Sequence, residues 1–306
     1  MEKVYENISV IIISYNCKQY LVDCIKSIIL TCYEFTPEIV IVDNNSDDGT
    51  VEYITNLFPE VKVIDNKTNL GYAAAINIGV KESNGDFLLL SNADVIYKKN
   101  SINNLVSKVK ELDCRVIVGP QQTFSNGDYQ RSYGFFPSIK RGIFDLFAIS
   151  KINQKIKEQR YKKKIIKDYY VDYIDGAAIC TTRDIFNNLQ GFDERYFFFS
   201  EESDFCYRAR ISNIKSVLTT ESLIVHHRGG SQENSGMNEK SIMMIINSEA
   251  LFIDIHHNSI TKKIYFVLQL LFFRLLLIKS KLINDKNRIE NNKKYINAIK
   301  LVLNGK

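Results

Sequence analysis

The sequence predicts an α/β fold, in which a mixed, mostly parallel sheet is flanked by helices and followed by a C-terminal helical extension. Three observations support this prediction. Short apolar runs, mostly β-branched, alternate with amphipathic segments over the first 120 residues. The runs are apolar almost throughout, as in parallel strands that helices cover on both faces. From about residue 238 onward, the pattern is that of helices alone.

The first half of the chain supplies five expected strands and the helices between them. The strands are expected at residues 8–13, 39–42, 61–64, 87–90 and 116–118. Within residues 18–31, the apolar residues recur at helical spacing and are expected on one helical face: Leu21, Ile25, Ile28 and Ile29. Further amphipathic segments predict helices at residues 51–57, 72–82 and 102–112.

The second half begins with a change of composition. Residues 121–168 are first aromatic and then strongly basic, and we expect a partly helical excursion from the sheet here. Strands are expected again at residues 169–174, 177–181 and 223–226, and helices at 183–189 and 203–211. We therefore divide the chain into a sheet domain and a helical extension. The expected boundaries are 1–235 for the sheet domain, with halves at 1–120 and 121–235 and a basic insertion at 140–168, and 236–306 for the extension.

Composition and charge narrow the classes of function. The chain has 306 residues, of which 45% are hydrophobic, so it can bury a sizeable core. Its net charge of +5 suits anionic ligands or an anionic membrane surface, but the clustered basic signal of a dedicated nucleic-acid-binding protein is missing. The six cysteines form no C-x-x-C pair and no zinc-like spacing, which predicts free thiols in a reducing cytoplasm.

The longest apolar stretch, residues 264–278, is interrupted by Gln269 and Arg274. It is shorter than the roughly 20 residues that cross a bilayer, and no signal peptide precedes the sheet domain. We therefore expect a cytoplasmic protein. Basic residues surround the stretch, so it can lie in the interface of the inner membrane face as a peripheral anchor. A helix that packs on the catalytic domain or on a second copy in a homo-oligomer is the alternative.

Polar residues follow the first four expected strands. Because the carboxyl ends of parallel strands meet at one edge, these residues are expected to converge there on a ligand. They comprise Ser14, Tyr15 and Asn16, residues 43–50, residues 66–71, and residues 91–94. The carboxylate of Asp94 is a hard oxygen ligand that suits Mg²⁺ or Mn²⁺, but a simple turn is the better explanation of residues 92–94 taken alone.

The loop at residues 43–50 does not have the spacing of an EF-hand. Asp43 can accept hydrogen bonds from a nucleotide base or ribose, while Ser46 or Asp48 is expected to cap the next helix. In residues 69–79, Gly71 and three alanines allow close approach of a backbone or ligand. Asn77 is a poor helix former within a helix, which indicates a special contact, although tight helix packing explains the alanines.

Four consecutive aromatic residues, 196–199, precede the acidic residues Glu201, Glu202 and Asp204. Aromatic rings can stack on a sugar, and a nearby carboxylate can accept a hydroxyl proton. Acidic residues also favour the first turn of a helix. At the last expected strand end, the pair formed by His226 and its neighbour favours contact with a metal or phosphate.

Taken together, these segments resemble glycosyltransferase family 2, the inverting enzymes with the GT-A fold, and within it the rhamnosyltransferase-like branch of bacterial surface polysaccharide biosynthesis. The resemblance covers roughly residues 7–232. It is carried, in the family's order, by residues 14–16, 42–50, 69–79, 88–95, 175–186, 191–210 and 226–231.

The resemblance implies a Rossmann-like GT-A fold and transfer of a sugar from a nucleotide-diphosphate-sugar to a hydroxyl of a glycan or lipid-linked glycan. Residues 1–120 would then bind the nucleotide, and residues 121–235 the acceptor. Asp94 and His226 would hold Mn²⁺ or Mg²⁺, and the base would be Glu202, with Asp204 and Glu201 as alternatives. The residues expected to contact the donor are Ser14, Tyr15, Asn16, Asp43, Asn45, Asn69, Gly71, Ala74, Asn77, Asn92, Ala93, Gly176 and Ala177.

The chain departs from the family pattern at two positions. Asn92 replaces the first aspartate of the D-x-D metal element, so metal affinity would rest on Asp94, His226 and the diphosphate. Glu202 replaces the usual aspartate base and is one methylene longer. Arg228 or the basic insertion could stabilise the leaving group. A nucleotidyltransferase, which would need a Gly-rich basic loop after the first strand, and a non-catalytic sugar-binding protein are the alternative functions.

Overall fold

The computed structural model describes residues 7–32, 36–227 and 238–305. The strands are β1 (Ile8–Ser14), β2 (Glu38–Asp43), β3 (Lys62–Asp65), β4 (Phe87–Asn92), β5 (Val95–Tyr97), β6 (Val116–Thr123), β7 (Tyr129–Gln130), β8 (Tyr133–Gly134), β9 (Asp168–Val171), β10 (Tyr173–Ile174), β11 (Ala178–Thr182) and β12 (Lys215–His226). The helices are α1 (Lys18–Thr31), α2 (Thr50–Leu57), α3 (Tyr72–Lys81), α4 (Ser101–Glu111), α5 (Ile139–Leu146), α6 (Ile149–Lys162), α7 (Arg183–Asn188), α8 (Glu201–Ile211), α9 (Glu239–His256), α10 (Ser259–Leu282) and α11 (Lys286–Leu303).

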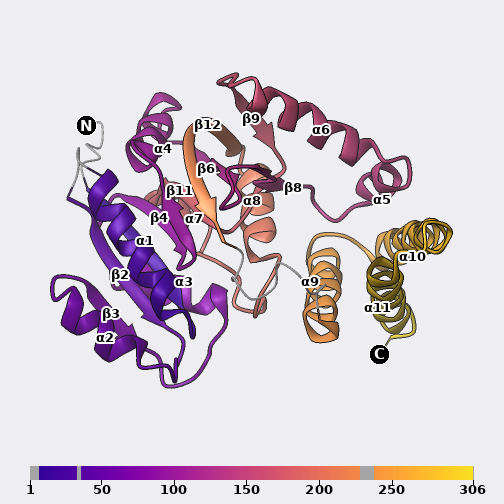
Figure 1. Cartoon of the computed structure of the whole chain (residues 1–306), viewed down its shortest axis with the longest axis horizontal. Helices are drawn as coiled ribbons and strands as arrows, with labels where there is room; N and C mark the ends of the chain where they lie inside the picture. Colours follow the sequence, from indigo (N-terminus) through magenta and orange to yellow (C-terminus); the bar gives the residue numbers. More distant parts are fainter. Residues whose placement is uncertain (1–6, 33–35, 228–237, 306) are drawn as a thin grey trace. The chain divides into compact units, whose positions relative to one another are not determined.

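The main sheet has the strand order β3-β2-β1-β4-β11-β6-β12-β5, with β7 beside β6 and β9 beside β12 (Figure 1). The first four strands are parallel, β6 is parallel to β12, and β11, β5, β7 and β9 pair antiparallel with their neighbours. This topology confirms the predicted mixed, mostly parallel sheet flanked by helices. Parallel neighbours need long crossovers, which α1, α2 and α3 provide in the first half.

Burial explains why the first strands are apolar throughout. The side chains of β1 and β4 are almost fully buried on both faces. Helix α3 packs so closely on this sheet that a Cβ at Gly79 would lie 2.4 Å from Ile11 Cγ2 and 3.0 Å from Val42 Cγ2. Glycine at position 79, a poor helix former, is therefore required by the approach of α3 to β1 and β2.

The last strand is longer than the sequence pattern predicted. Residues 223–226 were expected, whereas β12 already begins at Lys215. The register of β12 on β6 shifts between Thr219 and Leu223, as in a β-bulge. The bulge falls on a polar stretch, so the alternation of apolar residues that marks a strand is interrupted there.

The contacts of the chain define two compact units. The sheet unit comprises Met1–Gly134, Tyr161–Phe197 and Glu201–His227, and the helical unit comprises Phe135–Arg160, Phe198–Ser200 and Arg228–Lys306. In the helical unit, α10 packs on α5, α9 and α11. The rings of Phe136 and Phe252 stack in its interior at 5.9 Å. Gly142 of α5 is needed there, because a Cβ would lie 2.9 Å from the side chain of Leu268.

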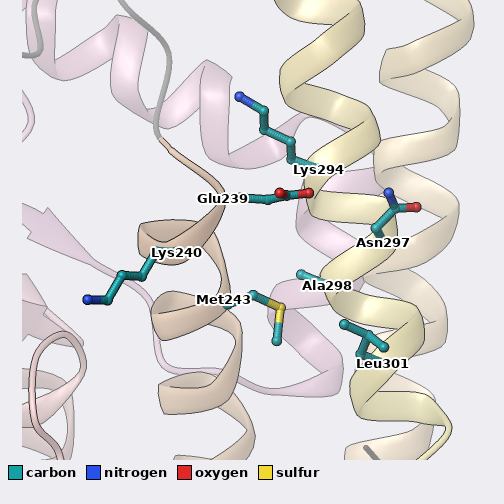
Figure 2. Close-up of a pocket in the computed structure, with 7 residues that line it drawn as sticks. All are labelled: Glu239, Lys240, Met243, Lys294, Asn297, Ala298 and Leu301. Atoms are coloured by element: carbon teal, nitrogen blue, oxygen red, sulfur yellow. The ribbon is translucent and has the colours of Figure 1, made fainter.

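A pocket of about 210 Å³ opens between α9 and α11 of the helical unit (Figure 2). Its lining combines three charged side chains with apolar ones: Glu239, Lys240, Met243, Lys294, Asn297, Ala298 and Leu301. The pocket contains none of the strand-end residues identified in the sequence. In the described part of the chain, no helix combines the length and the apolar character needed to span a bilayer. All six cysteines are free thiols.

Candidate active site

The register of the parallel strands aligns their polar ends. Ser14 pairs with Asp43, Asp43 pairs with Asp65, and Ile13 pairs with Asn92. Neighbouring strands lie about 4.8 Å apart, so Asp43 and Asn92 are about 10 Å apart at the same edge. The predicted convergence of strand-end residues is therefore present in the structure.

The loops after β1 and β2 are joined by hydrogen bonds. Asp43 is buried, and its two oxygens accept from the backbone N–H and the hydroxyl of Ser46, both at 2.7 Å. Asn16 accepts from the N–H of Asp47 at 2.9 Å, and its own N–H donates to Ser46 Oγ at 2.8 Å. The N-cap of α2 is Gly49, with φ of 75°, so the predicted cap by Ser46 is wrong. Asp48 lies one position before this N-cap and accepts from the Thr50 N–H at 3.1 Å.

The loop before α3 is held close to the chain at Phe197. The N–H of Tyr72 donates to Phe197 O at 2.9 Å, and a Cβ at Gly71 would lie only 2.4 Å from this oxygen. Gly71 also has a φ of 83°, which glycine adopts without strain. Asn69 accepts from the Gly71 N–H at 3.0 Å, and Asn44 donates to the Gly71 carbonyl at 3.1 Å.

Asn77 has a structural contact in place of the expected donor contact. Its amide donates to Phe192 O at 2.8 Å and to Glu194 Oε1 at 2.9 Å, and it accepts from the Phe192 N–H at 2.9 Å. A Cβ at Gly191 would lie 2.6 Å from Asn77 Oδ1. The special contact predicted for this residue is thus an anchor for the loop that leads to the acidic residues of α8.

The remaining expected donor residues lie around this edge. Tyr15 and Asn45 are exposed on the loops after β1 and β2, and Ala74 is half-buried in α3. The Asn92 N–H donates to the Ala177 carbonyl at 3.0 Å, and Ala93 is buried beside it. Gly176 lies next to Ala177 and faces Glu202, whose Cγ and Cδ would be 3.9 Å from a Cβ at position 176.

Asp94 and His226 form the candidate metal pair. His226 Nε2 lies 3.4 Å from Asp94 Oδ1, and both side chains are largely buried. His226 Nδ1 lies 3.1 Å from Gln122 Oε1, while Gln122 Nε2 donates to Asp175 Oδ1 at 3.0 Å. Since the amide oxygen of Gln122 can only accept, Nδ1 carries the proton. With the proton on Nδ1, Nε2 is the ring nitrogen that can bind a cation beside the carboxylate of Asp94.

Such a pair fits a divalent cation. Two ligands bound at about 2.1 Å and adjacent in the coordination shell lie about 3 Å apart, close to the observed separation. The hydrogen bond at Nδ1 is the support that metal-bound histidines commonly have. Among the residues that the structure describes, no third His, Cys, Asp or Glu completes a metal group. Arg228 and residues 229–231, also singled out in the sequence, lie outside the described residues.

Gln122 connects this pair to Asp175, whose charge acts on two further carboxyl groups, Glu201 and Glu202. Asp175 accepts from Gln122 and from the Ala177 N–H at 3.2 Å. Burial raises the pKa of Glu201 to about 7, and the charge of Asp175 adds to the shift. Burial also raises the pKa of Glu202 well above its usual range, and Glu201 and Asp175 raise it further. Glu201 Oε2 has no hydrogen-bond partner among the described residues.

Asp204, the alternative base, has a structural partner. It is fully buried, and Arg208 Nε donates to its carboxylate at 2.7 Å. Arg208 also donates to the carbonyls of Leu189 and Gly191, so the ion pair holds the loop before α8. The two acids on the same helix are thus in different environments: Asp204 is neutralised by Arg208, whereas no ion pair of Glu202 occurs in the described ranges.

Sequence reasoning missed three residues of this site. Asp175 and Gln122 connect the candidate base to the candidate metal pair, and the Tyr72 hydroxyl donates to the Gly176 carbonyl at 3.0 Å. Burial is the main cause that raises the pKa of Tyr72, and the charges of Glu201 and Glu202 raise it further. Asp175 had a usable signal, because it directly precedes Gly176. Two adjacent glutamines at the end of apolar strand β6 were a second signal.

Known proteins are similar in sequence to this chain. The sequence profile described as "Glycosyl transferase family 2" matches residues 9–179, more than half of the chain. The N-acetylglucosaminyl-diphospho-decaprenol L-rhamnosyltransferase of Mycobacterium tuberculosis is 25% identical over 206 residues, which cover 63% of this chain and 67% of that protein. The glycosyltransferase GlyG of Streptococcus pneumoniae is 31% identical over 126 residues, which cover 40% and 42%.

Two solved structures have a similar fold. GalNAc-T7, crystallised with UDP, GalNAc and Mn²⁺, superposes with a TM-score of 0.62 and 17% identity. The match covers 86% of this chain but only half (50%) of that one. The mannosyltransferase PcManGT of Pyrobaculum calidifontis, in complex with GDP-Man and Mn²⁺, has a TM-score of 0.62 and 14% identity over 98% of this chain and 87% of its own.

Proposed function

Because the chain belongs to glycosyl transferase family 2 and has the GT-A fold, we propose that it moves a sugar from a nucleotide-diphosphate-sugar onto a hydroxyl of a glycan or lipid-linked glycan, with inversion at the anomeric carbon. That the protein is a glycosyltransferase follows from the family. The donor class, the acceptor class and the stereochemistry are the proposal. A role in surface polysaccharide biosynthesis agrees with the rhamnosyltransferase relative.

The observation that carries the proposal is the position of Glu202. Its carboxyl faces Gly176, where an added Cβ would make only ordinary contacts, 3.9 Å from the Glu202 side chain. It has a raised pKa, and Asp175 and Gln122 connect its surroundings to the pair formed by Asp94 and His226. A carboxyl with raised basicity that faces a position without a side chain suits a general base.

Different residues of the site would contact the nucleoside, the diphosphate and the sugar of the donor. The loops that contain Ser14, Asn16, Asp43 and Asn45 would take the nucleoside, as the family resemblance implies. Asp94 and His226 would hold Mn²⁺ or Mg²⁺ against the diphosphate. When bound, this cation neutralises the negative charge that develops on the leaving group. The sugar would then lie between this pair and Gly176, close to Asn92, Ala93 and Ala177.

Glu202 accepts the proton of the acceptor hydroxyl as that oxygen attacks the anomeric carbon. The bond between this carbon and the diphosphate oxygen breaks in the same step, and the electron pair leaves with the nucleotide diphosphate. One displacement from the opposite face inverts the configuration, as in inverting glycosidases with the hydroxyl in place of water. Asp204 cannot take this role without losing the ion pair with Arg208.

A screen of nucleotide sugars tests the proposal. A donor that binds the folded chain raises its melting temperature by mass action, and a divalent cation at Asp94 should enlarge that shift. We expect one donor to stabilise the protein strongly with Mn²⁺ and weakly with EDTA, and to be hydrolysed slowly when the acceptor is absent. Binding without any turnover would instead favour a non-catalytic sugar-binding protein. Release of pyrophosphate from a nucleoside triphosphate incubated with a sugar 1-phosphate would instead favour a nucleotidyltransferase.

A further inference from the structure

Helix α10 exposes an apolar stripe along its whole length. The stripe consists of Ile260, Ile264, Val267, Leu271, Leu275, Ile278 and Leu282, of which Val267 is the least exposed at 40% and Leu282 the most at 82%. Repeated spacings of four and three place all seven within an arc of roughly 80° on a helix of 3.6 residues per turn. The buried residues of α10, among them Tyr265, Phe266 and Gln269, point the opposite way. The described residues of the helical unit therefore leave the stripe uncovered.

The charges that α10 itself carries are all of one sign. Helix α10 contains no Asp or Glu, whereas it contains Lys262, Lys263, Arg274, Lys279 and Lys281. Lys262 pairs with Asp254 on the far side at 2.6 Å. The helical angles place Lys263, Arg274 and Lys281 along one border of the stripe and Lys279 along the other.

We propose that α10 binds to the surface of an anionic lipid membrane, with its axis in the membrane plane and the apolar stripe at the boundary between head groups and acyl chains. An apolar face bordered by basic side chains is the pattern of interfacial helices. Anionic head groups satisfy every border charge at once. Two stripes packed against each other would instead bring basic side chains of both copies together at the rims, which disfavours a second copy as the occupant.

This surface would bring the enzyme to the place where a lipid-linked acceptor resides. That consequence rests on the proposed function, whereas lipid binding itself does not. The two can therefore fail separately. A chain that binds vesicles but transfers no sugar would refute the proposed function alone. An active chain that does not bind vesicles would refute the proposed membrane binding alone.

Flotation of the full chain with lipid vesicles tests the proposal. We expect binding to vesicles of phosphatidylcholine mixed with phosphatidylglycerol, weaker binding to phosphatidylcholine alone, and loss of binding as salt screens the charges. Replacing Leu271, Leu275 and Ile278 together by Gln should weaken binding at least tenfold. Replacing Lys263, Arg274 and Lys281 by Gln should weaken binding to the anionic vesicles roughly a hundredfold, at about a factor of five per basic residue.

A matched control and an assembly measurement complete the test. Ile211→Gln removes an equally exposed apolar side chain (66%) from the sheet unit and should not change vesicle binding. The stripe variant should melt at the temperature of the unmodified chain and hydrolyse a soluble donor at the same rate. Vesicle binding that is absent, or unaffected by the stripe variant, would overturn the proposal. So would a dimer in light scattering that this variant converts to a monomer.

Discussion

The two units of the molecule each contain a cluster of carboxyl groups that are partly or fully shielded from water, but the charges of the two clusters are compensated differently. In the helical unit, Arg141 forms an ion pair with Asp145 at 2.5 Å and its charge also acts on Glu249. In the sheet unit, Glu201 and Glu202 lie together with Asp175, and neither glutamate forms an ion pair within the part of the chain that the structure describes.

The difference distinguishes carboxyl groups that stabilise the fold from carboxyl groups that are available for chemistry. A buried charge needs an opposite charge if it only serves the fold, because isolation from water is costly. Carboxyl groups that repel each other with raised pKa values are therefore more typical of sites that bind a cation or move a proton. Helix α8 repeats the contrast over a short distance, since Asp204 is paired with Arg208 and Glu202, two residues earlier, is not.

The largest effect should come from Glu202→Gln. We expect the transfer rate to fall roughly a thousandfold, because general base catalysis is lost. Stability should stay the same or rise, since one of three mutually repelling carboxyl groups becomes neutral. Initial transfer rates and urea denaturation measure the two outcomes.

Asp204→Asn is the matched control on the same helix. It should lower the free energy of unfolding by about 3 kcal/mol, because Arg208 loses its buried partner. The transfer rate per folded molecule should change far less than in Glu202→Gln. If the two variants behaved the other way round, Asp204 would be the base and the contrast on α8 would be reversed.

Arg141→Met tests the compensated cluster of the helical unit. The change removes the cation beside Asp145 and Glu249 and should lower the free energy of unfolding by about 3 kcal/mol. Donor hydrolysis per folded molecule should be unchanged. Replacing Asp145 by Leu in the same chain should recover part of the loss, and a double variant as unstable as the single one would argue against an ion pair.

The pH dependence of stability should reveal the carboxyl cluster of the sheet unit, formed by Glu201, Glu202 and Asp175. Burial raises the pKa of Glu201 from 4.5 to about 7, so the folded chain binds a proton that the unfolded chain has released in this window. Stability should therefore fall as pH rises from about 4.5 to about 7, by on the order of 2 kcal/mol. Denaturation at a series of pH values should show a flatter profile for Glu201→Gln. An identical profile would contradict the raised pKa.

The smallest effect should come from Gln122→Leu. Without the amide oxygen at Nδ1, His226 loses the contact that fixes its tautomer, and Mn²⁺ affinity should fall roughly tenfold to a hundredfold. Mn²⁺ titration of the donor-induced melting shift measures it. Gln122→Glu keeps an acceptor and should restore most of the affinity. Equal Mn²⁺ affinity in the Leu variant would show that Gln122 does not orient the histidine.

The sequence was sufficient to predict those parts of the fold that depend on the local pattern of apolar and polar residues. Strands such as β1 and β4 are apolar throughout because both faces are covered, and the residues at their ends necessarily meet at one edge. It was insufficient where the reason lies far away in the chain. Gly142 looks like a helix breaker until α10 brings Leu268 against it, and nothing local joins residues 135–160 to the C-terminal helices.

The candidate site was predictable to a similar degree. Asp94, His226 and Glu202 could be named because each is a reactive side chain at an element boundary. Asn77 was assigned to the donor because its helical position signalled a special contact, but only the fold reveals that Phe192 and Glu194 are its partners. Asp175 was missed, since its importance depends on Gln122 in a distant strand.

Gly176 gives an entry point for protein engineering. Its backbone does not require glycine, and an added methyl group would make ordinary contacts, 3.9 Å from the Glu202 side chain. Variants at this one position can therefore narrow the space in front of the carboxyl while the scaffold stays intact. A small library there, screened against acceptors of different bulk, would be a direct route to altered linkage preference.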